Sequence, residues 1–487
     1  MPTVDHHRAP LLDGVRRYRD AGIVPFSTPG HKLGVGADSG LRDLFGAALE
    51  IDIPLGGGID DSHFSDDSLR AAESLAAAAW GADRSFFLVN GSSAGNHAFL
   101  LALLRPNDEV VIARDLHKSL LVALILTGAK PIYVAPRLHP DFNVGLGLDA
   151  ADVTATLDAH PAVKLVALVS PSYCGVPSDL GDIAAVAHRR NVPVYVDEAW
   201  GPHVGFHPDL PASAMASGVD GAVTSTHKVL ASLTQAAILN VQGPRVDLGR
   251  LETTVGMVQT TSPAASILAS IDACRRQMAL HGESLLTRTI ALANDARDRL
   301  LALPGVNVLD AEMLGIDAFD LTKLVIDVHG LGMTGFEVER LLRTRFRVQP
   351  EMSDLVGVVC LVTVGDTPAS IDRLVGAFTA LSAERRTPAS AQSLWRSSGA
   401  VIAPGVQALT PRDAFFATSR AVPLPESVGE VAAELVIPYP PGIPVLAPGD
   451  VISADKVDYL RHGAAHGMYL SGPSDSTLTT IRVVAEV

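Results

Sequence analysis

The chain has 487 residues, of which 47% are hydrophobic and 19% are charged, a composition typical of a globular protein with two or three domains. Its 53 acidic and 38 basic side chains leave a net charge of −15, which argues against nucleic acid or an anionic membrane surface as a partner. Three cysteines without CxxC spacing indicate neither a disulfide framework nor a metal site, and the polar N-terminus predicts a cytoplasmic protein.

From residue 83 to residue 241, short β-branched runs alternate with helix-like segments. The strand-like runs are 86–89, 110–113, 131–135, 165–169, 194–196, 221–224 and 236–241, and the helix-like segments include 94–104, 118–126 and 183–190. This alternation predicts a mostly parallel sheet with helices on both faces. After residue 221 fewer residues separate the strand-like runs, which suggests an antiparallel pair at the end of the sheet.

The second half of the chain has a different pattern. A long helical periodicity over 264–303 is followed by strand-like runs at 323–328 and 358–364, with a helix-like segment at 334–345 between them. This order is typical of a smaller α+β domain.

A polar, broken stretch over 382–399 is typical of a linker, and a last segment from about residue 401 holds a proline cluster at 438–444. We therefore predict an α/β protein with four parts, which are an N-terminal arm (1–50), a large sheet domain (51–255), a small α+β domain (256–385) and a C-terminal domain (386–487).

Small and hydroxylated residues follow the first predicted strand. The loop at 90–96 contains Ser92, Ser93 and Ala94 directly before a helix. Backbone N–H groups at a helix start, together with serine hydroxyls, favour an anion such as phosphate. The alternative is a well-capped helix with no ligand. Further along, His117 follows the strand at 110–113, where it could lie flat on a cofactor ring or have only a structural role.

An acid and a lysine end two later strands of the same predicted sheet. Asp197 closes the strand at 194–196, and Lys228 follows the strand at 221–224 after Ser225 and His227. A lysine that forms a Schiff base and an acid that holds a pyridinium nitrogen are the side chains that pyridoxal phosphate requires. Open α/β sheets bind ligands at the carboxyl ends of their strands, where both residues are expected.

The order of short motifs makes the resemblance to a known family specific. The motifs are Thr28–Lys32, Leu88–Asn96, His117–Ser119, Ser172–Gly175, Val196–Ala199, Ser225–Lys228, Thr234–Gln235 and Pro438–Pro444. From Phe26 almost to its C-terminus, the chain resembles the Orn/Lys/Arg decarboxylases, which use pyridoxal phosphate and have the aspartate aminotransferase fold. It is similar to the short form, which lacks an N-terminal wing domain.

The resemblance implies a role for each matching residue. Lys228 would hold the cofactor covalently, Asp197 would pair with its ring nitrogen, and His117 and Ala199 would pack on its two faces. The phosphate would be held by Ser92, Ser93, Ala94, Ser225 and His227. Lys228 and His227 are both candidates for returning a proton to the α-carbon, and the sequence does not rank them.

The implied substrate is a basic amino acid, arginine or lysine before ornithine, and the implied assembly is a homodimer or larger homo-oligomer with the active site at the subunit interface. Glu434, Asp60 and Asp61 are candidates for holding the substrate cation, although each is also explained as an ordinary surface carboxylate. Trp200 stands where the family often has histidine, and either lines the substrate side or fills a gap in the core. Leu33 also departs from the family, which often has glycine there.

Two other functions remain open from the sequence. A fold-type-I aminotransferase or lyase would use an arginine in the small domain, such as Arg345 or Arg347, to hold the substrate carboxylate. A non-catalytic protein of the same fold is the second alternative, and the intact Lys228 and Asp197 argue against it.

Overall fold

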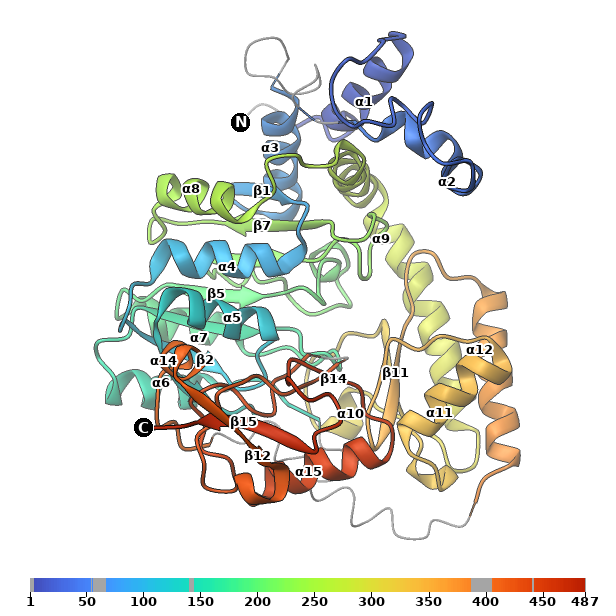
Figure 1. Ribbon diagram of the computed structural model, residues 1–487. Helices are drawn as coiled ribbons and strands as arrows, with labels where there is room; N and C mark the ends of the chain where they lie inside the picture. The colour runs from blue at the N-terminus through green and yellow to red at the C-terminus, as the bar shows by residue number, and fades with distance from the viewer. Residues whose placement is uncertain are drawn as a thin grey trace.

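A computed structural model describes residues 4–53, 55, 67–139, 144–386, 405–439 and 442–486. Its centre is a seven-stranded sheet in the order β1-β7-β6-β5-β4-β2-β3 (Figure 1). The strands are β1 (Arg84–Leu88), β2 (Glu109–Ala113), β3 (Lys130–Val134), β4 (Leu165–Val169), β5 (Val194–Asp197), β6 (Gly221–Thr224) and β7 (Ala237–Val241). Strands β2 to β6 are parallel, and β7 is antiparallel to both β1 and β6. The predicted parallel sheet and its antiparallel pair are confirmed.

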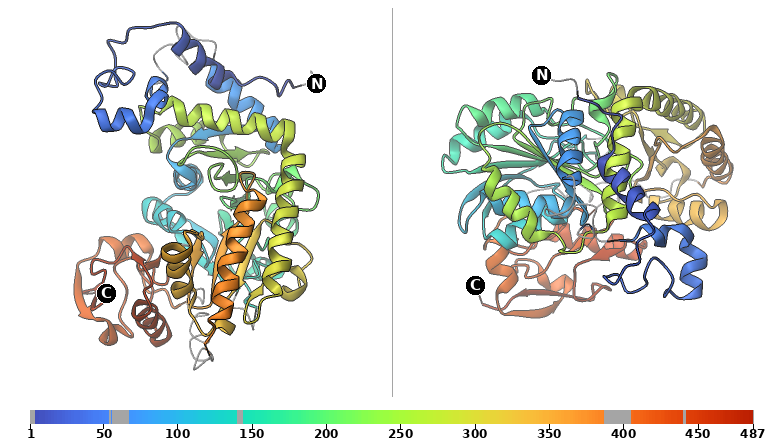
Figure 2. Two further views of the ribbon diagram at one scale, coloured as in Figure 1. Left: turned by 90° about the vertical axis from the view of Figure 1, so that its right-hand side faces the viewer. Right: turned by 90° about the horizontal axis from the view of Figure 1, so that it is seen from above.

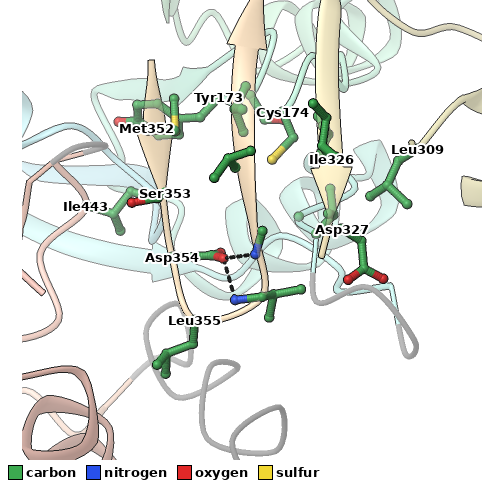
Figure 3. A pocket seen from close by; sticks show the side chains of 18 of the residues that line it. Tyr173, Cys174, Leu309, Ile326, Asp327, Met352, Ser353, Asp354, Leu355 and Ile443 are labelled. Atoms are coloured by element: carbon green, nitrogen blue, oxygen red, sulfur yellow. Dashed lines mark hydrogen bonds between the residues drawn. The ribbon is translucent and has the colours of Figure 1, made fainter. Parts of the chain in front are cut away.

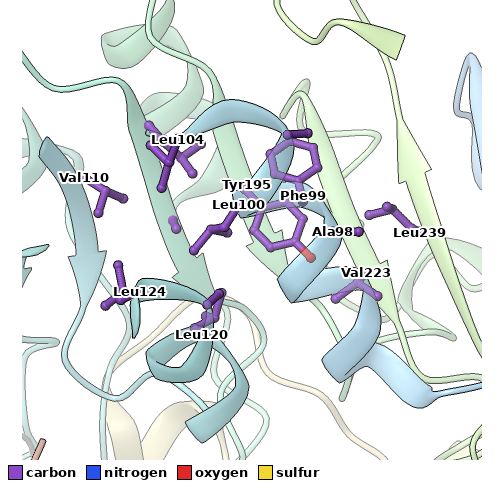
Figure 4. Close-up of a cluster of buried hydrophobic side chains, with 14 of the residues drawn as sticks. Ala98, Phe99, Leu100, Leu104, Val110, Leu120, Leu124, Tyr195, Val223 and Leu239 are labelled. Atoms are coloured by element: carbon purple, nitrogen blue, oxygen red, sulfur yellow. The ribbon is translucent and has the colours of Figure 1, made fainter. Parts of the chain in front are cut away.

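Helices cover both faces of this sheet, whose strands are mostly apolar and largely buried. They are α3 (Ser68–Trp80), α4 (Gly91–Leu103), α5 (Lys118–Thr127), α6 (Ala150–Ala159), α7 (Leu180–His188) and α8 (Leu248–Val258). Figure 4 shows Phe99 of α4 against Tyr195 of β5, and their rings stack with centroids 4.1 Å apart. Gly221 makes this packing possible, because a Cβ there would lie 2.2 Å from the Phe99 ring.

The 37-residue helix α9 (Ala265–Leu301) runs from the large sheet to a second, four-stranded antiparallel sheet (Figures 1 and 2). That sheet has the order β10-β11-β9-β8, with β8 (Asn307–Val308), β9 (Lys323–Asp327), β10 (Met352–Ser353) and β11 (Gly357–Leu361), and the helices beside it are α10 (Ala311–Leu314), α11 (Gly335–Leu341) and α12 (Pro368–Ala383). The predicted helix over 334–345 is α-helical only to Leu341 and continues as a π-helical turn to Phe346.

The C-terminal segment forms two small sheets of its own. Strand β12 (Ser419–Pro423) pairs with β15 (Thr480–Val484), β13 (Ile437–Pro438) pairs with β14 (Leu470–Ser471), and α14 (Pro411–Phe416) and α15 (Ala454–Ala465) pack around them. The buried Arg114, at the end of β2, donates hydrogen bonds to the carbonyls of Pro444 and Val445 and to Asp450. One buried guanidinium therefore ties this segment to the large sheet. Most of the predicted linker, from residue 387, lies outside the described residues.

The N-terminal segment contains α1 (Pro10–Asp20) and α2 (Ser39–Phe45), and α2 projects from the body of the molecule (Figure 2). Helix α1 is fixed at its start, because Asp272 of α9 accepts a hydrogen bond from the Leu11 N–H at 2.9 Å. In the described part of the chain, no helix is long and apolar enough to span a bilayer.

A fully buried ionic cluster joins the small sheet to the large one. Asp320 accepts a hydrogen bond from Lys323 Nζ at 2.6 Å and lies 3.1 Å from His203 Nε2, while Lys323 also donates to the Trp200 carbonyl at 3.2 Å. Burial alone would raise the pKa of Asp320, but His203 and Lys323 hold it well below its usual value. The cluster fixes the segment that directly follows Asp197.

We predict that Asp320→Asn lowers the free energy of unfolding at pH 7 by about 3–5 kcal/mol, because it leaves the buried Lys323 without its counter-charge. Urea denaturation would measure the loss. Since the ionised Asp320 contributes its full stability above its unfolded pKa of about 4 and loses it as the pH falls towards its lower folded pKa, the deficit relative to wild type should shrink progressively below about pH 4.

The exposed neighbour Asp317 provides the control, since Asp317→Asn should change stability by no more than about 0.5 kcal/mol. Equal stability of Asp320→Asn and Asp317→Asn would show that the cluster does not hold the two sheets together.

Candidate active site

Asp197 ends β5 and Lys228 follows the end of the neighbouring parallel strand β6, so the sheet brings them together. Asp197 is buried, and its carboxylate accepts hydrogen bonds from Asn96 Nδ2 at 2.7 Å and from the Ala199 N–H at 3.1 Å. Burial raises the pKa of Asp197, while Asn96, Lys228 and Ala199 oppose that rise. The carboxylate is therefore placed to hold a positive charge at the end of the sheet.

Asn96 of α4 connects Asp197 to the predicted stacking residue. Its carbonyl oxygen accepts from Tyr195 Oη at 2.8 Å, and its amide nitrogen also donates to Ser119 Oγ at 2.8 Å. Ser119 Oγ in turn lies 2.7 Å from His117 Nδ1. One amide thus fixes both the acid and the imidazole, a role that we did not predict for Asn96.

The lysine lies against an aromatic ring. Lys228 Nζ is 4.1 Å from the centroid of the Trp200 ring, and burial lowers the pKa of Lys228 to about 8 although Asp197 and Glu351 oppose this. Burial, followed by the charge of Lys228, also lowers the pKa of His117 to about 3. Lys228 is therefore mainly protonated at physiological pH but loses its proton far more readily than an ordinary lysine, and the imidazole of His117 is uncharged.

Hydroxyl groups gather where α4 begins. Ser92 Oγ and Ser225 Oγ, from the starts of α4 and of the loop after β6, lie 2.7 Å apart. Ser93 and Ala94 occupy the same first turn of α4, whose unpaired N–H groups favour an anion. His227 lies beside them with Nδ1 2.8 Å from the Ala236 carbonyl.

These groups fit pyridoxal phosphate. Lys228 can bond to its aldehyde, Asp197 to its ring nitrogen, and the start of α4 to its phosphate. Within the described residues, the buried hydroxyls of Tyr173 and Thr226 have no hydrogen-bond partner, and the charge of Asp197 acts on Tyr173. Buried hydroxyls are normally paired, so a polar ligand would complete this site. The described residues contain no cluster of His, Cys, Asp or Glu that could hold a metal ion.

The other predicted site residues lie elsewhere. Glu434 is buried in the C-terminal segment and accepts hydrogen bonds from Ser474 and from the Arg482 N–H, so it is not the ordinary surface carboxylate of the alternative explanation. Asp60 and Asp61 lie outside the described residues. Arg345 pairs with Glu384 on the surface, so it does not hold a substrate carboxylate in this arrangement.

Two charged residues near Lys228 were not predicted. Glu351 precedes β10, and Lys228 and Lys323 both act on the pKa of its carboxyl, which burial raises. Lys323 lies behind Trp200, with Nζ 5.9 Å from the ring centroid. Neither residue belongs to a recognisable motif, so only the folded arrangement shows that they are close to the site.

Comparisons with known proteins identify the family of the chain. Residues 9–322 match the model of the Orn/Lys/Arg decarboxylase major domain, and residues 400–472 match that of the C-terminal domain. The chain is 39% identical to an arginine decarboxylase of Bacillus subtilis, over 99% of both chains.

Two solved structures share the fold. The lysine decarboxylase LdcF of Francisella novicida superposes with a TM-score of 0.81 and 21% identity over 98% of this chain and 81% of its own. An alanine–glyoxylate aminotransferase from Nostoc superposes with a TM-score of 0.53 and 17% identity over 64% of this chain and 85% of its own. The predicted aminotransferase-like fold is thereby confirmed.

We predict that the protein without cofactor captures pyridoxal phosphate at a rate that rises with pH through a midpoint near 8. Only the neutral amine attacks an aldehyde, and burial lowers the pKa of Lys228 to about 8. Stopped-flow absorbance of the bound cofactor would measure the rate. A midpoint near 10, the value of an ordinary lysine, would contradict this account.

Proposed function

The chain belongs to the Orn/Lys/Arg decarboxylase family, and we propose that it removes the α-carboxylate of free L-arginine to give the corresponding amine and CO2. Dependence on pyridoxal phosphate and decarboxylation of a basic amino acid follow from the family. The choice of arginine rests on the relative with 39% identity, which is named an arginine decarboxylase, whereas the lysine decarboxylase LdcF is only 21% identical.

Bound pyridoxal phosphate supplies the electron sink that accepts the electron pair left on the α-carbon when CO2 departs. The protein's part is to orient and to hold charge. We infer that Asp197 keeps a proton at the ring nitrogen, that His117 and Ala199 fix the ring plane, and that Ser92, Ser93, Ala94, Ser225 and His227 hold the phosphate. Each assignment is supported by the position of the residue around Lys228.

The geometry favours Lys228 over His227 as the group that returns a proton to the α-carbon. The Ala236 carbonyl can only accept, so Nδ1 of His227 carries the ring proton and donates it to that oxygen. Burial lowers the pKa of His227, so its Nε2 has no proton to give unless a phosphate next to it raises that pKa. Lys228 Nζ, with its pKa near 8, exchanges protons readily at neutral pH.

The substrate cation requires an acid near this centre. We propose Glu351 for this role, since its carboxyl and the Lys228 amine act on each other electrostatically. The Trp200 ring lies against Lys228 Nζ and would line the substrate side. Asp60 and Asp61 remain candidates from the sequence, and Glu434 is engaged in the C-terminal segment.

We predict that the protein with pyridoxal phosphate forms the amine of arginine and equimolar CO2, at a higher kcat/KM than with lysine, ornithine or glutamate. Chromatography of the amines and CO2 trapping would measure this. Lys228→Ala should lower kcat on the order of a thousandfold or more, while the exposed Lys130→Ala should not change it. A keto acid as product would identify an aminotransferase, and a preference for lysine would refute the substrate.

We also propose a cytoplasmic homodimer with its active site at the interface, and the four domain limits given above. The support for pairing is the N-terminal segment, on which Phe26, Val35 and Leu44 are 97%, 80% and 80% exposed. Large apolar side chains gathered on a projecting segment are typical of a protein interface. Most soluble oligomers are homo-oligomers, so we propose a second copy of the chain as the partner that covers this apolar surface.

We predict that Phe26→Ser combined with Leu44→Ser converts the dimer to monomers, because it removes apolar surface that pairing would bury. Light scattering after size exclusion would measure the mass. Met257→Ser, at a position 72% exposed on α8, serves as the control and should stay dimeric. A double variant that remains dimeric would show that the pairing surface lies elsewhere.

A further inference from the structure

A cavity of about 170 Å³ lies where the large domain, the small domain and the C-terminal segment meet. Its wall includes Asp115 and Tyr173 from the large sheet, Met352 and Asp354 from the small sheet, and Ile443 from the C-terminal segment (Figure 3). Lys228, Asp197, His117 and Ser92 are not among its lining residues. The cavity therefore adjoins the site at Lys228 through Tyr173, but these four residues do not form its wall.

The wall of the cavity is largely apolar, with Leu309, Val325, Met352 and Ile443 among its residues, and it carries three carboxylates. Asp327 already pairs with His329, which leaves Asp115 and Asp354 as the two acids that could bind a ligand. Among the described residues, no lysine or arginine lines it. Desolvation raises the pKa of both carboxyls, and at Asp115 the charge of the adjacent Arg114 opposes that rise only in part.

The carboxylates of Asp115 and Asp354 can each accept hydrogen bonds from a ligand. Asp354 uses only Oδ1, which accepts the N–H groups of Val356 and Gly357 at 2.7 and 2.8 Å, and Oδ2 accepts nothing from the described residues. Asp115 is 6% exposed, and no other described residue donates a hydrogen bond to its side chain. Asp354 is exposed to solvent, whereas the buried Asp115 is the unusual case, because buried charges are normally paired.

The size of the cavity limits the ligand. An apolar cavity of about 150 Å³ is known to hold benzene, so this one accommodates about six to eight non-hydrogen atoms. Apolar walls with two acids suit an aliphatic chain that carries a cation at each end. We propose that the cavity binds a free alkyl diamine or guanidinoalkylamine, as a second molecule distinct from the one that reacts at Lys228.

Contact with the reaction centre would run through two rings. Tyr173 lines the cavity and packs edge-on against Trp200, with centroids 6.0 Å apart, and Trp200 carries Lys228 Nζ on its face. An occupant that moves Tyr173 would therefore alter the surroundings of Lys228. If the proposed function holds, the occupant belongs to the same chemical class as the product, and its binding would let the amine regulate its own formation.

Equilibrium dialysis with radiolabelled 1,4-diaminobutane would test the proposal on holoenzyme treated with borohydride, which fixes the cofactor to Lys228 and blocks the reaction centre. We expect one diamine to bind per chain. Asp354→Asn and Asp115→Asn should each weaken binding at least tenfold. Asparagine at 354 keeps the Oδ1 acceptor of the turn, so both the fold and the cavity should persist. Asp317→Asn, an exposed acid outside the cavity, should bind as wild type.

Loss of diamine binding on borohydride treatment would overturn the proposal, because the cavity would then belong to the reaction centre. Absence of binding before treatment, or equal affinity in Asp354→Asn and Asp317→Asn, would also overturn it. Dialysis does not depend on turnover, so a failed decarboxylase assay and a failed diamine measurement remain distinguishable.

Discussion

The structure depends on one buried carboxylate. Asp197 lies at the end of β5, away from water, where an isolated charge is strongly unfavourable. Its neighbours offset that penalty, since the Asn96 amide and the Ala199 N–H donate to it and Lys228 lies opposite. A bound pyridinium would complete this set of partners. The acid thus defines the position and the charge of the group that the site accepts.

The surrounding residues act as a unit because Asn96 is shared. Its carbonyl is held by Tyr195, and its amide binds both Asp197 and Ser119, which holds His117. The Asp197 carboxylate and the His117 imidazole are therefore held by the same amide. Behind Lys228, Trp200 is fixed by Lys323 and the Asp320 cluster. The small sheet in this way sets the position of an aromatic ring that contacts the reactive amine.

Much of this site could be predicted, because residues at the carboxyl ends of parallel strands converge whatever the details of packing. Asp197, Lys228, His117 and Ser92 follow that rule. Asn96 did not stand out, because its role depends on distances of 2.7 and 2.8 Å to residues 101 and 23 positions away. Lys323 could not be predicted for the same reason, since nothing in the sequence indicates that a lysine at the start of an apolar strand is buried. The π-helical turn after Leu341 likewise depends on packing, because the apolar periodicity continues through it.

The most direct test of the central claim is the location of the cofactor bond. Borohydride reduction of the holoenzyme, followed by peptide mapping, should place the pyridoxyl label on Lys228 alone. A label on another lysine, such as Lys323, or no label on any peptide, would contradict the account.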